Sequence, residues 1–164
     1  MDLLSIALIV STLLCSLVAG FLFSFAVVVM PGINRLSDRE FIRAFQAMDG
    51  IIQNNQPIFM LVWIGSVLAL VTAATLGFSY LEGWPSWLLI VAAVGYLLGV
   101  QLPTFTINVP LNNRLQSLAV DASDDSALAV SREVFEGSWN RWNIIRTVIA
   151  CLVSLLLIVV VFGS

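Results

Sequence analysis

Two clusters of polar side chains interrupt otherwise apolar stretches of this sequence, and both carry groups able to do chemistry. The members of the first follow one another at spacings of three, four and four residues, which places them on one helix face: Gln101, Thr104, Asn108 and Asn112. The second cluster opens the last apolar stretch and combines a cation, an amide and two indoles: Trp139, Trp142, Asn143 and Arg146. Fixed hydrogen-bond donors can stabilise an oxyanion, and indoles can stack on a flat ring. We therefore expect a polar pocket between these two segments.

Roles within this pocket follow from the chemistry of each side chain. Arg146 would hold an anion, and Asn108 and Asn143 would donate hydrogen bonds to the reacting group. The expected substrate contacts are Trp139, Trp142, Asn112, Thr104, Gln101 and Met30, the last because a bend at Met30 and Pro31 would roof the pocket. Candidate bases near the rim are Asp49 and Glu136, neither with an obvious partner. A structural alternative stays open, in which Arg146 is a snorkelling anchor and the tryptophans form an interfacial belt.

The segments that carry these clusters are long and almost free of charge. Four stretches, 3–34, 50–81, 83–113 and 143–164, hold a single charged residue, Arg146. A helix needs about 20 apolar residues to cross the hydrocarbon core of a bilayer. The chain is 60% hydrophobic and 10% charged, with a mean hydropathy of +1.01. We predict one integral membrane domain, 1–164, with spans at about 3–30, 57–81, 86–111 and 143–162.

The predicted fold class is all-α: a transmembrane four-helix bundle of up-down topology. An amphipathic interfacial helix should lie between spans 1 and 2. Ser37 and Glu40 have the spacing of a capping box, and Phe41 and Phe45 then recur at helical spacing. The last span should be preceded by a helix from about Ser126, with an interruption at Gly137.

Composition and charge exclude several classes of function. Histidine and lysine are both absent, so we expect no metal site and no Schiff-base chemistry. The absence of a CxxC pair disfavours thiol redox chemistry, and spans without Asp or Glu disfavour a proton-coupled transporter. Seven arginines against ten acidic residues give no support to nucleic-acid binding.

The arginines also predict an orientation. Three of the seven follow span 1, and the other four lie between the end of span 3 and the first turns of span 4. Loops rich in arginine usually stay on the cytoplasmic side. Both termini should then lie outside and both large loops in the cytoplasm. The expected partner is the lipid bilayer; small residues on span 3, Gly95 and Gly99, leave a homo-oligomer open.

Four pairs of short motifs, spread in order over nearly the whole chain, carry a resemblance to a known family: Gly20–Phe23 with Val29–Gly32, Gln46–Met48 with Asn55–Phe59, Thr104 with Asn108–Asn113, and Trp139–Asn143 with Arg146. The sequence resembles the anthrone-oxygenase-like family of small four-span membrane proteins. The resemblance implies oxidation of an apolar aromatic or quinol-like molecule by O₂ without a cofactor, in a bacterial inner (plasma) membrane. The alternative from another class is a membrane protein that binds lipid, quinone or a partner protein and catalyses nothing.

Overall fold

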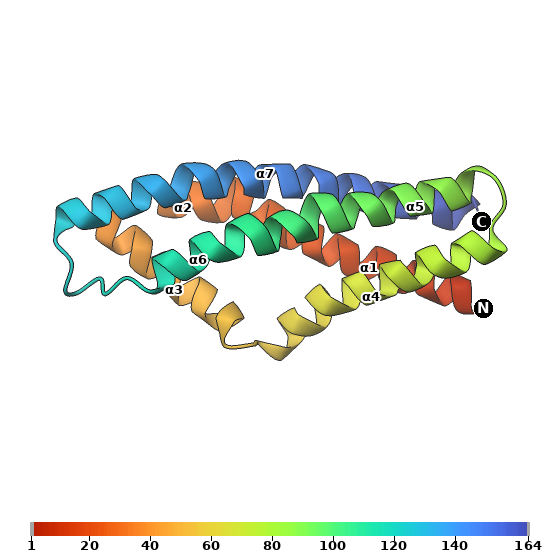
Figure 1. Cartoon of the computed structure of the whole chain (residues 1–164), viewed down its shortest axis with the longest axis horizontal. Coiled ribbons are helices and arrows are strands. Elements are labelled where there is room, and N and C mark those ends of the chain that lie inside the picture. Colours follow the sequence, from red (N-terminus) through yellow and green to blue (C-terminus); the bar gives the residue numbers. More distant parts are fainter. Residues whose placement is uncertain (1, 164) are drawn as a thin grey trace.

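Four long helices run side by side in the computed structural model, which describes residues 2–163 (Figure 1). Each is long and apolar enough to cross a membrane, and their bounds are Leu3–Ile33, Pro57–Tyr80, Trp84–Gln116 and Asp125–Gly163. The described residues form no strand. The predicted all-α bundle of four membrane-length helices is therefore confirmed.

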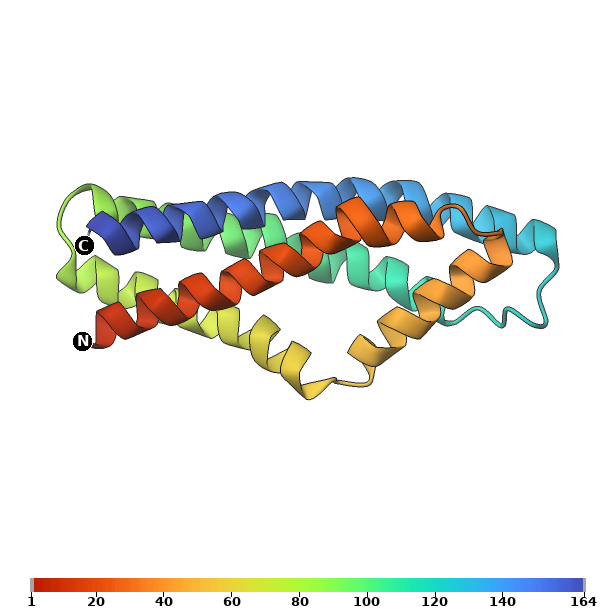
Figure 2. The same ribbon diagram turned by 180° about the vertical axis from the view of Figure 1, so that it is seen from behind.

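The chain runs up and down the bundle, so both termini lie at the same end (Figures 1 and 2). Its elements follow in the order α1 (Leu3–Ser24), η1 (Phe25–Val29), α2 (Met30–Ile33), α3 (Asp38–Gln53), α4 (Pro57–Tyr80), α5 (Trp84–Tyr96), η2 (Leu97–Gln101), η3 (Thr104–Asn108), α6 (Val109–Gln116) and α7 (Asp125–Gly163). The terminal end holds both termini and the turn at 81–83. The loop end holds α3 and the connection 117–124.

Three π-helical turns, η1, η2 and η3, widen two of the long helices, and each ends two residues before a proline: Pro31, Pro103 and Pro110. In a regular helix a proline ring collides with the carbonyl four residues earlier, and a wider turn relieves that contact. The helices thus continue through their prolines. Because each π turn adds a residue, it also changes which side chains face the interior.

The interior of the bundle is apolar, and so is its outer surface. Fully buried leucines from all four long helices form the core, with Leu8 on α1, Leu70 on α4, Leu89 on α5 and Leu157 on α7. Many large apolar side chains, among them Leu13 and Val148, point outward instead. An exposed apolar surface that surrounds all four helices suits hydrocarbon rather than water.

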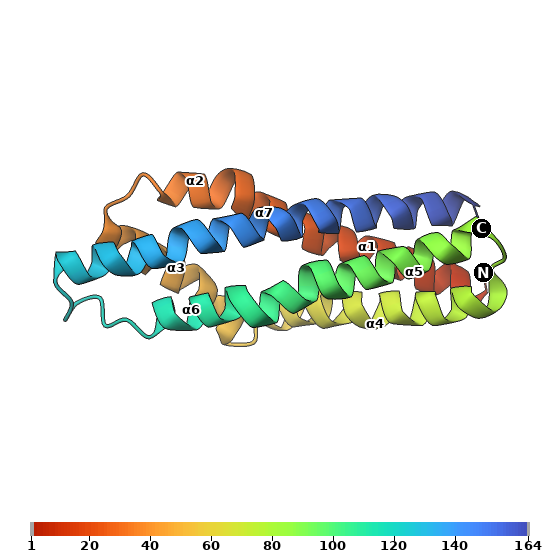
Figure 3. The ribbon, with the colours of Figure 1, turned by 45° about the horizontal axis from the view of Figure 1, so that its top comes forward.

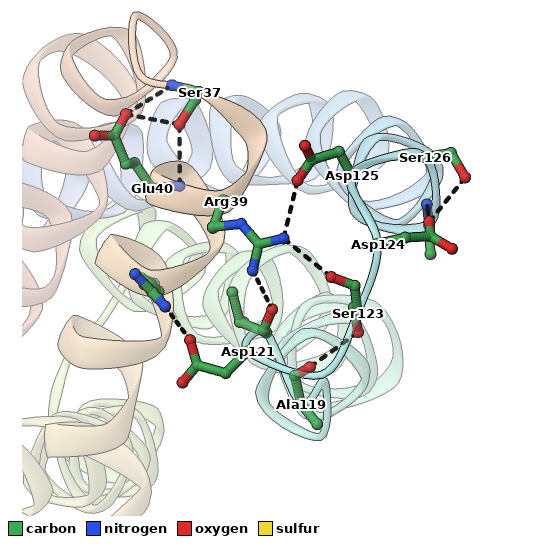
Figure 4. Close-up of polar contacts among 12 residues, drawn as sticks. Ser37, Arg39, Glu40, Ala119, Asp121, Ser123, Asp124, Asp125 and Ser126 are labelled. Atoms are coloured by element: carbon green, nitrogen blue, oxygen red, sulfur yellow. Dashed lines mark hydrogen bonds and ion pairs between the residues drawn. The ribbon is translucent and has the colours of Figure 1, made fainter.

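Helix α3 starts with the predicted capping box. The Ser37 hydroxyl accepts from the Glu40 backbone N–H at 3.4 Å, and the Glu40 carboxylate accepts from the Ser37 N–H at 3.2 Å (Figure 4). At the same end Arg39 donates to the carbonyls of Val120 and Ser123 and pairs with Asp125 at 2.9 Å (Figure 4). These bonds fasten α3 to the connection that leads into α7.

The apolar face of α3 is covered by protein. Phe41 and Phe45 are buried, and the Phe45 ring meets Phe135 of α7 edge-on, with the ring centroids 4.6 Å apart. Helix α7 spans the molecule from the loop end to the terminal end (Figure 3). The expected interruption at Gly137 is wrong, because α7 is unbroken there. One exposed glycine costs a helix about 1 kcal/mol, which packing on both sides outweighs.

Close contact between η2 and α7 depends on Gly99. A Cβ atom at this position would lie 2.6 Å from Cδ1 and 2.9 Å from Cγ2 of Ile149, so Gly99→Ala forces the two helices apart. We expect this substitution to destabilise the fold by about 1–3 kcal/mol. Gly95→Ala is the matched control, since its Cβ would meet Val153 at an ordinary 3.8 Å. Thermal unfolding in detergent would measure both; equal melting temperatures would contradict the packing described.

Candidate functional site

A cavity of about 270 Å³ lies between the helices toward the loop end. Helix α3 and all four long helices contribute to its walls. Its volume is near the lower end of the roughly 300–1,000 Å³ common for small-molecule sites. Most of the lining is aromatic or aliphatic, and the polar lining residues are Asp49, Thr104, Asn108, Asn112, Asn143 and Arg146.

Arg146 is the one arginine that lines the cavity. It is 3% exposed, and its guanidinium donates to Thr104 Oγ1 at 2.9 Å and to Asn143 Oδ1 at 3.1 Å. Both acceptors are neutral, and among residues 2–163 no carboxylate oxygen lies within 4.0 Å of this guanidinium. A buried cation usually has an anionic partner. Arg146 thus presents an unbalanced positive charge to the cavity.

Polar side chains of η3 and α7 surround Arg146 and are held in place by hydrogen bonds. Asn143 lies one turn before Arg146 on α7, and its amide donates to the Leu22 carbonyl of α1 at 3.1 Å. Asn108, at the end of η3, donates to the Trp139 carbonyl at 3.4 Å, while its own buried Oδ1 has no partner. Thr104 opens η3 and donates to the Val100 carbonyl, which leaves its oxygen free to accept from Arg146. The π turn therefore aims two polar side chains at α7.

Asp49 of α3 is the second charged group of the cavity. It is 5% exposed, and its two oxygens accept from Asn112 Nδ2 at 2.8 Å and from Gln53 Nε2 at 2.6 Å. Burial raises the pKa of this carboxyl above its ordinary value, and the two amide hydrogen bonds oppose part of that rise. A carboxylate with a raised pKa is a stronger base than one in water.

Trp139 fixes the orientation of the amide that holds Asp49. The indole Nε1–H donates to Asn112 Oδ1 at 2.7 Å, so the Asn112 amide nitrogen must face Asp49. The same ring meets Phe45 edge-on, with centroids 5.6 Å apart, and Phe25 at 5.7 Å. Phe59 and Trp63 of α4 also line the cavity, and their rings stack at an interplanar angle of 20°. Aromatic faces on two sides shape the cavity for a flat ligand.

A comparison with protein families decides what kind of protein this is. The anthrone oxygenase family matches residues 58–156, which run from the start of α4 into the second half of α7. The chain belongs to the anthrone oxygenase family. No curated protein and no solved structure matches the chain. The family resemblance drawn from the sequence motifs is confirmed.

The part that matches the anthrone oxygenase family contains most of the cavity's polar groups. Five of the six polar lining residues fall within 58–156, whereas Asp49 lies before it on α3. Helix α3 thus adds a carboxylate to the portion shared with the family. Asp49 also carries a signal in the sequence: it lies four residues after Phe45 and three before Ile52, on the apolar face of an amphipathic helix. The sequence alone predicts Asp49 only as a candidate base at the rim.

The structure brings six of the nine predicted site residues to the cavity: Arg146, Asn108, Asn143, Trp139, Asn112 and Thr104. The other three lie elsewhere. Trp142 is half-buried on α7 outside the lining, and Gln101 is buried beyond Thr104, farther from the loop end. Met30 is buried beside Pro31, Asn34 and Glu136, where it borders a separate shallow hollow. The bend at Met30 therefore does not roof the cavity of this anthrone oxygenase family member.

Two other features of the described residues bear on where chemistry can occur. Residues 2–163 contain no group of three or more His, Cys, Asp or Glu side chains arranged to hold a metal ion. A larger hollow of about 630 Å³ lies at the terminal end, between the first turns of α1 and the end of α4. Its polar lining consists of Asp2, Ser5 and Tyr80 at the surface. The cavity at Arg146 alone combines burial with opposite charges, and it is the candidate site.

Proposed function

We propose that this protein oxidises a flat aromatic ketone of the anthrone type with O₂, converting a ring CH₂ group into a carbonyl without a resident cofactor. The observation that carries the proposal is that one apolar cavity is lined by a cation and a carboxylate that are not paired with each other. Arg146 lacks a carboxylate partner, and the Asp49 carboxylate, with a raised pKa, lines the same space. An acid–base reaction that generates an oxyanion needs both groups.

In the first step Asp49 removes a proton from the ring CH₂ group. The C–H bond breaks, the proton moves to a carboxylate oxygen of Asp49, and the electron pair delocalises onto the ketone oxygen. That oxygen becomes an oxyanion, which Arg146 stabilises through its guanidinium. Loss of the proton makes the central ring of the substrate aromatic, and this is why the CH₂ group is acidic enough for a carboxylate to deprotonate. The two neutral acceptors of Arg146 keep its charge available to the substrate.

In the second step the enolate reacts with O₂. It transfers one electron to form superoxide and a carbon radical, and the two combine into a peroxide at the former CH₂ carbon. Protonated Asp49 returns its proton to the outer peroxide oxygen. The carboxylate then takes the remaining hydrogen of that carbon, the O–O bond breaks, and the departing hydroxide collects the proton as water. One substrate and one O₂ thus yield one quinone and one water.

The apolar wall contributes by excluding water. Phe25, Phe45 and Phe59 cover much of the lining, which strengthens electrostatic interactions inside the cavity and protects the enolate from reprotonation. The amides of Asn108 and Asn143 supply fixed dipoles without adding charge. A role as a non-catalytic quinone or lipid binder would use the same cavity and differ only in the absence of turnover.

Oxygen consumption by the purified protein separates the two roles. With a simple anthrone, we expect O₂ uptake well above the rate of a protein-free sample, one O₂ per anthraquinone formed. With ¹⁸O₂, the new carbonyl should carry one ¹⁸O atom. Binding of the anthrone without uptake above the protein-free rate would refute the oxygenase and favour the non-catalytic binder.

A further inference from the structure

Two side chains that line the cavity also reach the outer surface of the bundle. Ile64 of α4 is 53% exposed, and Phe105 of η3 is 62% exposed. The remaining lining residues are buried or half-buried, with none on the exposed surface. The cavity therefore opens outward between α4 and η3.

This opening results from the path of α4. Near the terminal end α4 packs against α1 and α5, and toward the loop end it diverges from α6 (Figures 1 and 2). The three-residue connection 54–56, in which Asn55 has a φ of 57°, joins it there to α3. No side-chain hydrogen bond joins residues 57–64 to residues 104–112, all within the described part of the chain. The two helices stay apart at this height.

The surroundings of the opening are apolar. On α4 the neighbouring outward residues are Leu61 and Leu68, and the helix carries no charged residue. Beside Phe105, Leu102 is also exposed, and the next charged residue along the chain is Arg114, nine residues on, or about 13 Å along a helix. An opening placed this deep in an apolar belt faces hydrocarbon.

The side of the cavity toward the loops is closed by hydrogen bonds instead. Gln53 donates to Asp49 and, at 3.2 Å, to Asn113 of α6. Gln46 donates to the Leu115 carbonyl at 2.8 Å, and Gln116 donates back to the Gln46 carbonyl at 3.3 Å. These bonds form a seam that joins α3 to α6 beside Asp49.

We infer that the ligand enters sideways from the bilayer, between Ile64 and Phe105, and that the substrate is therefore an aromatic molecule dissolved in the membrane. The inference rests on the proposed function in one respect, that the cavity receives an aromatic ring. A ring that slides in from the lipid meets Trp63 and Phe59 first and then brings its polar edges to Arg146 and Asp49. Water-soluble aromatics are poor substrates by this route.

The rates of ligand binding test the route, because a gate changes association and dissociation together and leaves the equilibrium constant alone. Anthraquinone binding to the protein in lipid nanodiscs would be followed by stopped-flow quenching of tryptophan fluorescence. We expect Ile64→Phe to slow both rates by about tenfold with little change in Kd. Ile64→Ala should accelerate both. Leu68→Phe is the matched control, since Leu68 is 63% exposed on the same helix outside the cavity, and should leave both rates unchanged.

A variant on the loop side provides the opposing case. Asn113→Ala removes one bond of the α3–α6 seam, and lateral entry predicts no change in the binding rates. Unchanged rates in both Ile64 variants, with faster association in Asn113→Ala, would overturn lateral entry and place the entrance at the loop end. Failure of the unaltered protein to bind anthraquinone at all would instead refute the cavity as an aromatic site, and with it the proposed function.

Discussion

Arg146→Met should reduce the rate of anthrone oxidation by roughly 100- to 1,000-fold, the usual loss when one donor to a developing oxyanion is removed. The methionine fills a similar volume but leaves the oxyanion of the enolate without its cation. Anthraquinone formation, followed by absorbance, would measure the rate. A rate within a fewfold of the unaltered protein would show that Arg146 does not hold the reacting group.

The same substitution should leave the fold intact or make it more stable. Arg146 is buried without an anionic partner, and removing an unpaired buried charge relieves its desolvation cost. Thermal unfolding in detergent would therefore show an equal or higher melting temperature alongside the lost activity. Arg141→Met is the matched control, because Arg141 lies on the same helix at an exposed position and should keep full activity.

Asp49→Asn should reduce the rate by about 100- to 10,000-fold at neutral pH, the range typical of a missing general base. The asparagine oxygen can still accept from Asn112, but its amide nitrogen can accept neither from Gln53 nor from the substrate carbon. At alkaline pH, where the anthrone ionises in water, the deficit should shrink because no protein base is then required. An equal deficit at every pH would indicate a structural role for Asp49.

The pH dependence of the unaltered protein follows from the same carboxyl. Asp49 must be ionised to act as a base, so activity should fall as the pH drops through its raised pKa. The folded state binds this proton more tightly than the unfolded chain, so the Asp49 contribution to stability decreases as the pH rises from the ordinary carboxyl pKa to the raised one. Asp49→Asn should abolish both effects. Activity that is flat across acidic pH would contradict this assignment.

The bundle follows from the sequence because a membrane-length apolar helix is a property of one continuous segment. Each of the four apolar stretches is long enough to span, and the Ser37–Glu40 box needs only local spacing. The polar stripe on span 3 was also predictable for the same reason. Thr104, Asn108 and Asn112 share a face whose register depends on nearby residues alone.

The positions of Asp49, Met30 and Gln101 relative to the cavity depend on how segments distant in the sequence pack together. Asp49 reaches the cavity because the turn at Asn55 folds α3 back against α6 and α7, which no local pattern specifies. Met30 lies outside the lining, buried in an apolar cluster with Phe45 and Trp139, so its place depends on how α1, α3 and α7 meet. Gln101 lies beyond the Arg146–Thr104 hydrogen bond, which marks the inner limit of the cavity.

A structure determined with anthraquinone bound would show whether the cavity between Arg146 and Asp49 holds the substrate. We expect the rings to lie between Trp139 and Trp63, with one ketone oxygen accepting hydrogen bonds from the Arg146 guanidinium and the opposite edge toward Asp49. A ligand in the hollow at the terminal end, or one bound in the cavity without contact to Arg146, would contradict this placement.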